Sequence, residues 1–218
     1  MLYADQSSHA CELHSTSLRL NFNFAPGDRW QHGLDVFSDN EWRRMLTSVE
    51  GSPDTPHPPS PAFQDLRLER IDSHTAEVQL FGQSGQRVYS AAVRVDGLRE
   101  VIDFDVCCRL PRQQIGPPLF SSYSLPIGRR VECLSKDSSQ ICVGFPPFPI
   151  EMEILSLANQ PRPVWRTETM DTGVSLQLGC LEVTRAAASK TAATVRWRYV
   201  VRFQSASHTA DKPPSALA

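Results

Sequence analysis

The sequence predicts a mainly β protein: an antiparallel barrel or sandwich of about nine to eleven strands, with one short α-helix that caps it. Leu18, Leu20, Phe22 and Phe24 alternate with polar residues, and this period of two places one face of a strand against a core. From residue 63 to 203, one strand-like segment follows another. No strand alternates with a helical segment, as a parallel sheet would require, so we expect the strands to be antiparallel.

Apolar segments bounded by turn residues define the other expected strands. They are residues 64–71, 75–81, 86–95, 98–108, 129–134, 139–145, 149–157, 163–169, 173–185 and 192–204. Asp96-Gly97 is typical of a two-residue type I′ hairpin turn, because both residues tolerate a positive φ. With a second turn at 82–85, residues 75–108 are expected to form a three-stranded meander. Further hairpin turns are expected at 136–139 and 186–190.

One helix is predicted over residues 39–50. Ser38 and Glu41 have the spacing of a capping box, in which a hydroxyl and a carboxylate each satisfy a free amide of the first turn. The apolar residues that follow recur at the spacing of one helical face. They are Trp42, Met45, Leu46 and Val49.

The 218-residue chain is expected to hold a single β-rich domain, residues 16–204. Residues 1–15 carry no usable pattern and are expected to be a flexible arm, and residues 205–218 a disordered tail. Residues 52–61 hold five prolines; because proline fixes φ and lacks an amide donor, they should form an extended surface linker. Residues 111–126, with four prolines, are expected to be a loop or crossover.

Composition and charge argue against several partners. The formal net charge is −2, so no global field attracts the chain to nucleic acid or to an anionic membrane. No apolar run is long enough to span a bilayer, and the first residues lack the basic start and apolar stretch of a secretory signal. The six cysteines are therefore expected to be reduced and mostly buried, in a soluble cytoplasmic protein.

Familiar catalytic motifs are missing from the sequence. None of the six histidines falls on a predicted core strand, so a Ser-His-Asp or Cys-His arrangement is not expected. They are His9, His14, His32, His57, His74 and His208. The chain has no GxGxxG, P-loop or C-x-x-C sequence. A zinc site at residues 9–14 is disfavoured, because its ligands would lie in the expected flexible arm.

Charged residues recur on one face of several expected strands, opposite an apolar face. They are Arg196, Arg198 and Arg202 in 192–204, Glu151 and Glu153 in 149–157, Asp103 and Asp105 in 98–108, and Arg67 in 64–71. In one interpretation these faces are exposed to solvent. In the other, the sheet closes into a barrel with its charged faces inside.

We therefore expect a non-catalytic β-rich binding or assembly module without a cofactor, which engages a protein or a small anionic ligand through a charged sheet face. The four arginines would be the binding residues, because a guanidinium can grip a carboxylate or phosphate with two hydrogen bonds. The alternative is a phosphohydrolase-like barrel that depends on Mg²⁺ or Mn²⁺. Its metal would be held by the four acidic residues, and its phosphorylated substrate by the arginines. A third hypothesis is an apolar ligand pocket rimmed by residues 118–120 and 145–149.

Overall fold

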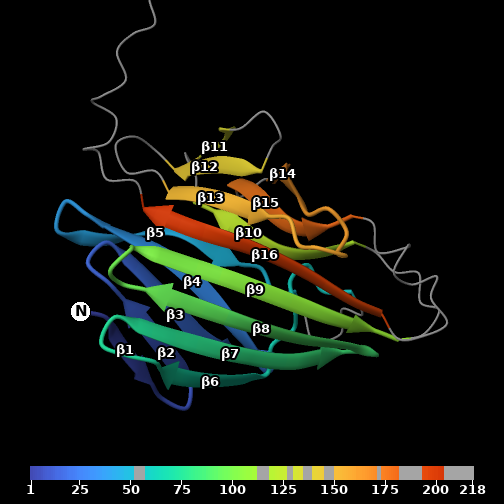
Figure 1. Cartoon of the computed structure of the whole chain (residues 1–218), viewed down its shortest axis with the longest axis horizontal. Coiled ribbons are helices and arrows are strands. Elements are labelled where there is room, and N and C mark those ends of the chain that lie inside the picture. Colours follow the sequence, from blue (N-terminus) through green and yellow to red (C-terminus); the bar gives the residue numbers. More distant parts are fainter. Residues whose placement is uncertain are drawn as a thin grey trace, which may run out of the picture.

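The computed structural model describes residues 1–51, 57–111, 118–126, 130–134, 139–144, 150–170, 173–181 and 193–203. In this part of the chain, sixteen strands form two antiparallel eight-stranded sheets that enclose one core (Figure 1). The mainly β prediction is confirmed. The sheets remain separate and do not close on each other, so the fold is a sandwich. Within the described residues no helix is long and apolar enough to cross a membrane.

Sheet A has the order β1-β2-β3-β4-β5-β10-β15-β14. Its strands are β1 (Tyr3–Gln6), β2 (Ala10–His14), β3 (Leu18–Ala25), β4 (Arg29–Ser38), β5 (Glu41–Ser48), β10 (Leu119–Leu125), β15 (Gly173–Cys180) and β14 (Val164–Met170). Sheet B has the order β11-β12-β13-β16-β9-β8-β7-β6. Its strands are β11 (Arg130–Cys133), β12 (Gln140–Gly144), β13 (Ile150–Leu155), β16 (Ala193–Phe203), β9 (Val101–Leu110), β8 (Arg87–Asp96), β7 (Thr75–Ser84) and β6 (Asp65–Arg70).

The expected meander of residues 75–108 is confirmed as β7-β8-β9 (Figure 1). Its second turn, however, is longer than the predicted type I′ turn. Asp96 pairs with Val101, and the left-handed residue is Glu100, with φ 52°. The carboxylate of Asp96 accepts hydrogen bonds from the amides of Leu98 and Arg99, both at 3.0 Å. These side-chain bonds stabilise a four-residue loop instead of a two-residue turn.

The predicted helix over 39–50 is wrong, because residues 41–48 form β5. Asp39 and Asn40 have φ 52° and 63°, the two positive values of a type I′ hairpin turn. Opposite Leu34 and Asp35, the register of β5 skips Met45, which is therefore the extra residue of a β-bulge. The bulge buries Met45 and its neighbour Leu46 together. Because the bulge interrupts the two-residue period, the apolar residues of β5 recur in the sequence at a spacing that is also typical of one face of a helix.

The expected flexible arm of residues 1–15 is also wrong, because most of it forms β1 and β2. Leu2, Cys11 and Leu13 are buried, and they anchor the N-terminal strands on the core. These two strands, of four and five residues, are too short and too mixed in composition for alternation to identify them in the sequence. The expected tail of residues 205–218 lies outside the described residues.

Two Pro-rich segments differ from the prediction as well. Within 111–126, the expected loop, residues 119–125 form the buried strand β10. In the expected linker, residues 52–56 lie outside the described part, but Ser60 is buried instead of lying on the surface. Its hydroxyl bonds the amide (2.9 Å) and the carbonyl (3.1 Å) of Ser122 in β10. The Ser60 side chain thus provides hydrogen-bond partners for the backbone of Ser122, which lies just outside the short ladder between β10 and β5.

The hairpin expected around 186–190 is wrong, because β15 and β16 belong to different sheets. The turn residues themselves lie outside the described segments. Both strands alternate apolar and polar residues, and this alternation does not specify the neighbouring strand.

The core between the sheets contains large aromatic side chains from both. Phe22 and Tyr123 come from sheet A, and Trp197 and Tyr199 from sheet B; all are at most 2% exposed. Cys11, Cys108 and Cys180 are buried thiols without a disulfide.

Candidate functional site

The predicted charged residues of β9, β13 and β16 lie on the outer face of sheet B, open to solvent. Arg196 donates from Nε and Nη2 to the two carboxylate oxygens of Asp105, with a distance of 2.5 Å for the Nε bond. Arg198 holds Asp103 in the same two-point way, with an Nε bond of 2.8 Å. Arg202 Nη1 lies 2.7 Å from an oxygen of Glu153.

These pairs leave the outer-face arginines largely neutralised. The side chains of Arg196, Arg198 and Arg202 are 38–50% exposed, and ion pairs of such exposure contribute little to stability. Glu151 lies opposite Arg202 in the β13–β16 register. Arg67 is exposed on the edge strand β6, four strands away from β16.

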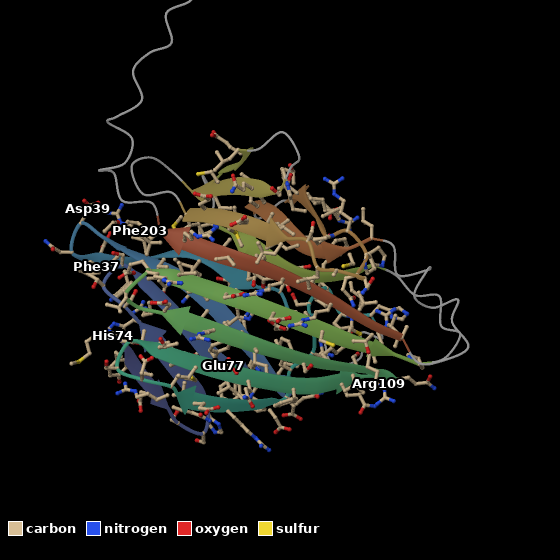
Figure 2. All side chains as sticks on the ribbon, in the orientation of Figure 1. Phe37, Asp39, His74, Glu77, Arg109 and Phe203 are labelled. Atoms are coloured by element: carbon tan, nitrogen blue, oxygen red, sulfur yellow. The ribbon has the colours of Figure 1, made fainter. Side chains whose placement is uncertain are left out.

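The geometry therefore brings together seven of the eight predicted site residues and leaves Arg67 apart. Figure 2 shows this face of sheet B with its dense side chains, including the labelled Glu77 and Arg109. Three of the four carboxylates that the metal hypothesis needs, those of Asp103, Asp105 and Glu153, are engaged by arginines on an open face. Among the described residues, no group of three or more His, Cys, Asp or Glu side chains is arranged to hold a metal ion.

A second cluster of polar groups lies inside the sandwich, around His32. The sequence places His32 in a connection between strand and helix, but in the structure it lies on β4 and is 7% exposed. Its Nε2 lies 2.9 Å from the Tyr123 hydroxyl, which is 2.5 Å from the Tyr199 hydroxyl. Trp197 donates to Ser121 at 3.1 Å. The cluster links the inner faces of the two sheets.

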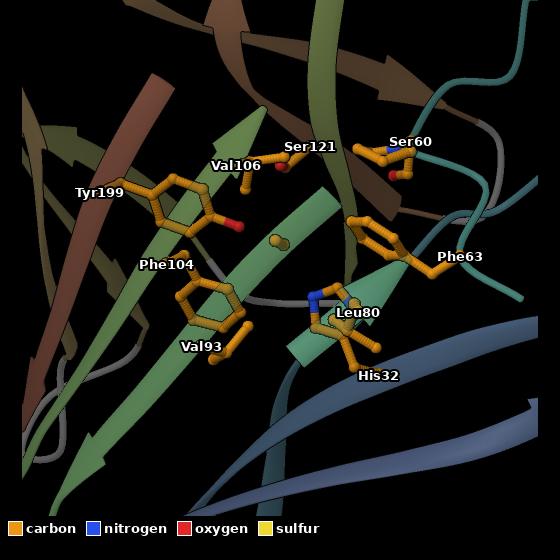
Figure 3. A pocket seen from close by; sticks show the side chains of 11 residues that line it. His32, Ser60, Phe63, Leu80, Val93, Phe104, Val106, Ser121 and Tyr199 are labelled. Atoms are coloured by element: carbon orange, nitrogen blue, oxygen red, sulfur yellow. The ribbon is translucent and has the colours of Figure 1, made fainter. Parts of the chain in front are cut away.

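A small cavity adjoins this cluster. Figure 3 shows the side chains of His32, Phe63 and Tyr199 around it. It leaves about 10 Å³ for the centre of a water molecule, roughly the room that one buried water needs. The rest of its lining is mostly apolar and includes Leu80 and Phe104. This space is too small for an organic ligand.

Burial changes the acidity of these groups. Desolvation, helped by the positive charge of Arg44, lowers the pKa of His32 to about 3. His32 is therefore neutral at physiological pH, and its Nδ1 has no hydrogen-bond partner among the residues that the structure describes. Desolvation raises the pKa of Tyr123 and of Tyr199 far above the ordinary value, so both phenols keep their protons.

Glu50 is a buried acid that follows β5. It is 7% exposed, and desolvation raises its pKa to about 7 against the opposing effects of a hydrogen bond from Ser48 and the charge of Arg29. The Ser48 hydroxyl donates to Oε1, whereas Oε2 is buried and has no hydrogen-bond partner within the described segments. Near neutral pH, Glu50 is therefore only partly ionised.

Two arginines are buried at the same end of the sandwich. Arg29 opens β4, is 4% exposed, and donates from Nη1 to the backbone carbonyl of Glu50 at 2.5 Å. Arg87 opens β8, is 2% exposed, and faces inward with Tyr89. Both positive charges act on the Tyr89 hydroxyl, and Arg87 also hydrogen-bonds it. Desolvation nevertheless dominates and raises the pKa of Tyr89 to about 12.

The Arg87 guanidinium is incompletely satisfied. Its Nε and Nη2 atoms are buried and have no hydrogen-bond partner among the described residues. They are the same two nitrogens with which Arg196 and Arg198 grip their aspartates on the outer face. Leaving a charged donor pair buried and unpaired costs several kcal/mol, so these two unpaired donors of Arg87 are the most unusual polar feature among the described residues.

Sequence reasoning missed all four residues of this buried cluster, Arg29, Glu50, Arg87 and Tyr89. A signal exists for Arg87, because it stands in the same alternation phase of β8 as Tyr89 and three further inward residues. An arginine in the core phase of a strand is rare enough to suggest a partner. Arg29 and Glu50 have no such signal, because β4 and β5 were not expected as strands.

Comparisons with known proteins add no functional assignment. The chain matches no protein-family model and none of the curated proteins with which it was compared.

Proposed function

We propose that the protein is a non-catalytic binding module for a small anion that carries a carboxylate or phosphate group, held between the sheets by Arg87 with Arg29 nearby. The observation that supports this proposal is the guanidinium fork of Arg87, whose Nε and Nη2 are buried without a hydrogen-bond partner in the described part of the chain. A carboxylate or phosphate that reached these two nitrogens would satisfy both with two parallel charge-assisted hydrogen bonds.

The electrostatics of the cluster favour an anion. Two guanidinium groups are buried there, while the nearby acid, Glu50, has a pKa of about 7 and carries only part of a negative charge near neutrality. An uncompensated positive charge in a low-dielectric interior is unfavourable. A bound oxyanion would neutralise it and supply the missing acceptors.

The other expectations have weaker support. The arginines of the outer face already hold Asp103, Asp105 and Glu153, so an anionic ligand would have to displace an existing partner. For the metal-dependent phosphohydrolase, the same carboxylates would have to leave their arginines to bind a cation. Recognition of another protein through this face stays a prediction.

We expect acetate or inorganic phosphate to raise the melting temperature of the wild-type protein in a concentration-dependent way at constant ionic strength. Binding to the native state alone stabilises it by RT ln(1 + [L]/Kd). Arg87→Met removes both fork donors and should abolish the shift. Arg87→Lys keeps the charge without the fork and should weaken binding about tenfold or more.

The matched control is Arg196→Met, which removes a solvent-exposed arginine of the same sheet and should leave the ligand-induced shift intact. Calorimetric titration of each variant with both probes gives the dissociation constants directly. The proposal fails if neither probe stabilises the wild type, or if Arg87→Lys binds as tightly as the wild type. If Arg87→Met does not fold, Arg87→Lys still tests whether binding requires the two donors of a guanidinium or only a positive charge.

A further inference from the structure

Among the described residues, the edge strand β14 has a neighbour on one side only. It pairs with β15 along its whole length, and it ends sheet A. Residues 166–169 are exposed. The strand has no proline between Val164 and Met170. At these exposed positions, an edge strand can pair with another strand.

The opposite side of the sandwich is closed in a different way. There the edge strands β1 and β6 are joined through the side chain of Gln6. Its amide oxygen accepts from the Leu68 amide at 2.9 Å, and its amide nitrogen donates to the Leu66 carbonyl at 3.3 Å. Leu2 also donates to Ser73 at 3.1 Å. No comparable bridge to β14 is found within the described residues, so β14 is the available edge of sheet A.

The sequence of β14 is complementary to itself in the antiparallel direction. In a two-fold symmetric pair, residues opposite each other must point to the same face, so one residue of the strand lies opposite itself. With Thr167 at this centre, Arg166 of each copy lies opposite Glu168 of the other, and two opposite-charge pairs form. Centring the pair on Arg166 or on Glu168 instead places like charges opposite each other, which is unfavourable.

From this complementarity we propose that two copies of the chain associate through antiparallel pairing of β14, with Thr167 at the two-fold axis. Sheet A then continues from one copy into the other. Trp165 of one copy lies opposite Thr169 of the other on the second face of the strand. The inference is independent of the proposed anion site, because it uses a different edge and different residues.

Among the described residues of the single chain, the side chains of Arg166 and Glu168 do not pair with each other. Arg166 donates from Nε to Gln177 on β15 at 2.5 Å, and its guanidinium lies 4.6 Å from the centre of the Phe120 ring. Glu168 is exposed and, within the described part of the chain, forms no ion pair. A rotation of the Arg166 side chain toward the free edge supplies the partner that Glu168 lacks. Because one strand pair buries a small area, the dimer is weak and depends on concentration.

Charge exchange tests the register directly. Sedimentation velocity over a wide concentration range should show a monomer–dimer equilibrium for the wild type. Glu168→Arg places two arginine pairs in opposition, and Arg166→Glu places two glutamate pairs there. Each single variant should weaken association by about tenfold or more. The double variant R166E/E168R restores both opposite-charge pairs in the same register and should associate as the wild type does.

The matched control is Arg67→Glu, which reverses an exposed charge on the edge strand of sheet B and should leave association unchanged. All these side chains are exposed, and circular dichroism verifies that each variant is folded. The proposal is overturned if the wild type stays monomeric at the highest concentration, if single reversals have no effect, or if the double variant fails to recover. Loss of anion binding by Arg87→Lys alters none of these outcomes.

Discussion

The stability of the wild-type protein should change little between about pH 4.5 and 6.5 through Glu50 and His32, because these two buried groups act in opposite directions there. In the native state the pKa of Glu50 rises from 4.5 to about 7, through desolvation. The native protein thus binds more protons than the unfolded chain across this interval. The stabilisation is complete below pH 4.5 and is lost as the pH rises through 7. Its size is about 3 kcal/mol, at 1.36 kcal/mol per pKa unit.

His32 contributes with the opposite sign. Desolvation lowers its pKa from 6.5 to about 3, so the unfolded chain binds the extra proton between these two values. The associated stability is complete above pH 6.5 and is lost as the pH falls toward 3. The size of this effect is about 5 kcal/mol. Below pH 4.5, only His32 of these two groups still changes the free energy of unfolding with pH. Its effect lowers the stability of the protein as acid is added.

Two variants separate the opposing contributions. In Glu50→Gln, the stability relative to wild type should increase as the pH rises from 4.5 to 7. In His32→Gln, the stability relative to wild type should increase as the pH falls from 6.5 toward 3. Urea unfolding at half-unit pH steps measures both differences, and the contributions of the exposed carboxylates cancel in the comparison. Difference curves that stay flat for both variants would contradict the assignment of these titrations.

Gly82→Ala should destabilise the protein by about 2–3 kcal/mol, a cost typical of overpacking. A Cβ at this position of β7 would lie 1.8 Å from the carbonyl oxygen of Ala62 and 2.8 Å from the Cα of Phe63. Both obstacles are backbone atoms, so no side-chain rotation relieves the overlap. The segment is also held by a hydrogen bond of 2.8 Å from the Gln64 amide to the Phe81 carbonyl.

Gly85→Ala is the matched control in the turn that follows β7. Gly85 has φ 58°, and a Cβ there would meet nothing within 4 Å. Its substitution should cost about 1–2 kcal/mol, from backbone strain alone. Adding the double variant G82A/G85A shows whether the two costs are additive, as expected of independent causes. If Gly82→Ala were as stable as the wild type in urea, the close crossing of Ala62 and β7 would be wrong.

Alternation identified strands best where one face meets the core along the whole segment. Leu18, Leu20 and Phe22 are buried as expected, and so are Val195 and Trp197 in β16. Segments that depart from strict alternation were misread. Ser38-Asp39-Asn40-Glu41 fits a helix cap as well as a hairpin turn, and a bulge at Met45 made the following strand look helical. The local sequence is compatible with a helix and with a hairpin strand, and pairing with β4 decides between them.

The sequence by itself determined the mainly β class, the central meander, and the presence of charged faces opposite apolar ones on β9, β13 and β16. Only the tertiary structure decided which sheet each strand joins and which way those charged faces point. It also decided that Arg87, Glu50 and His32 are buried. The physical reason is that a two-residue period separates the two faces of a strand but does not specify the layer that covers each face. Burial of a charge depends on segments far apart in the chain, and here those segments bury the Arg87 guanidinium between the sheets.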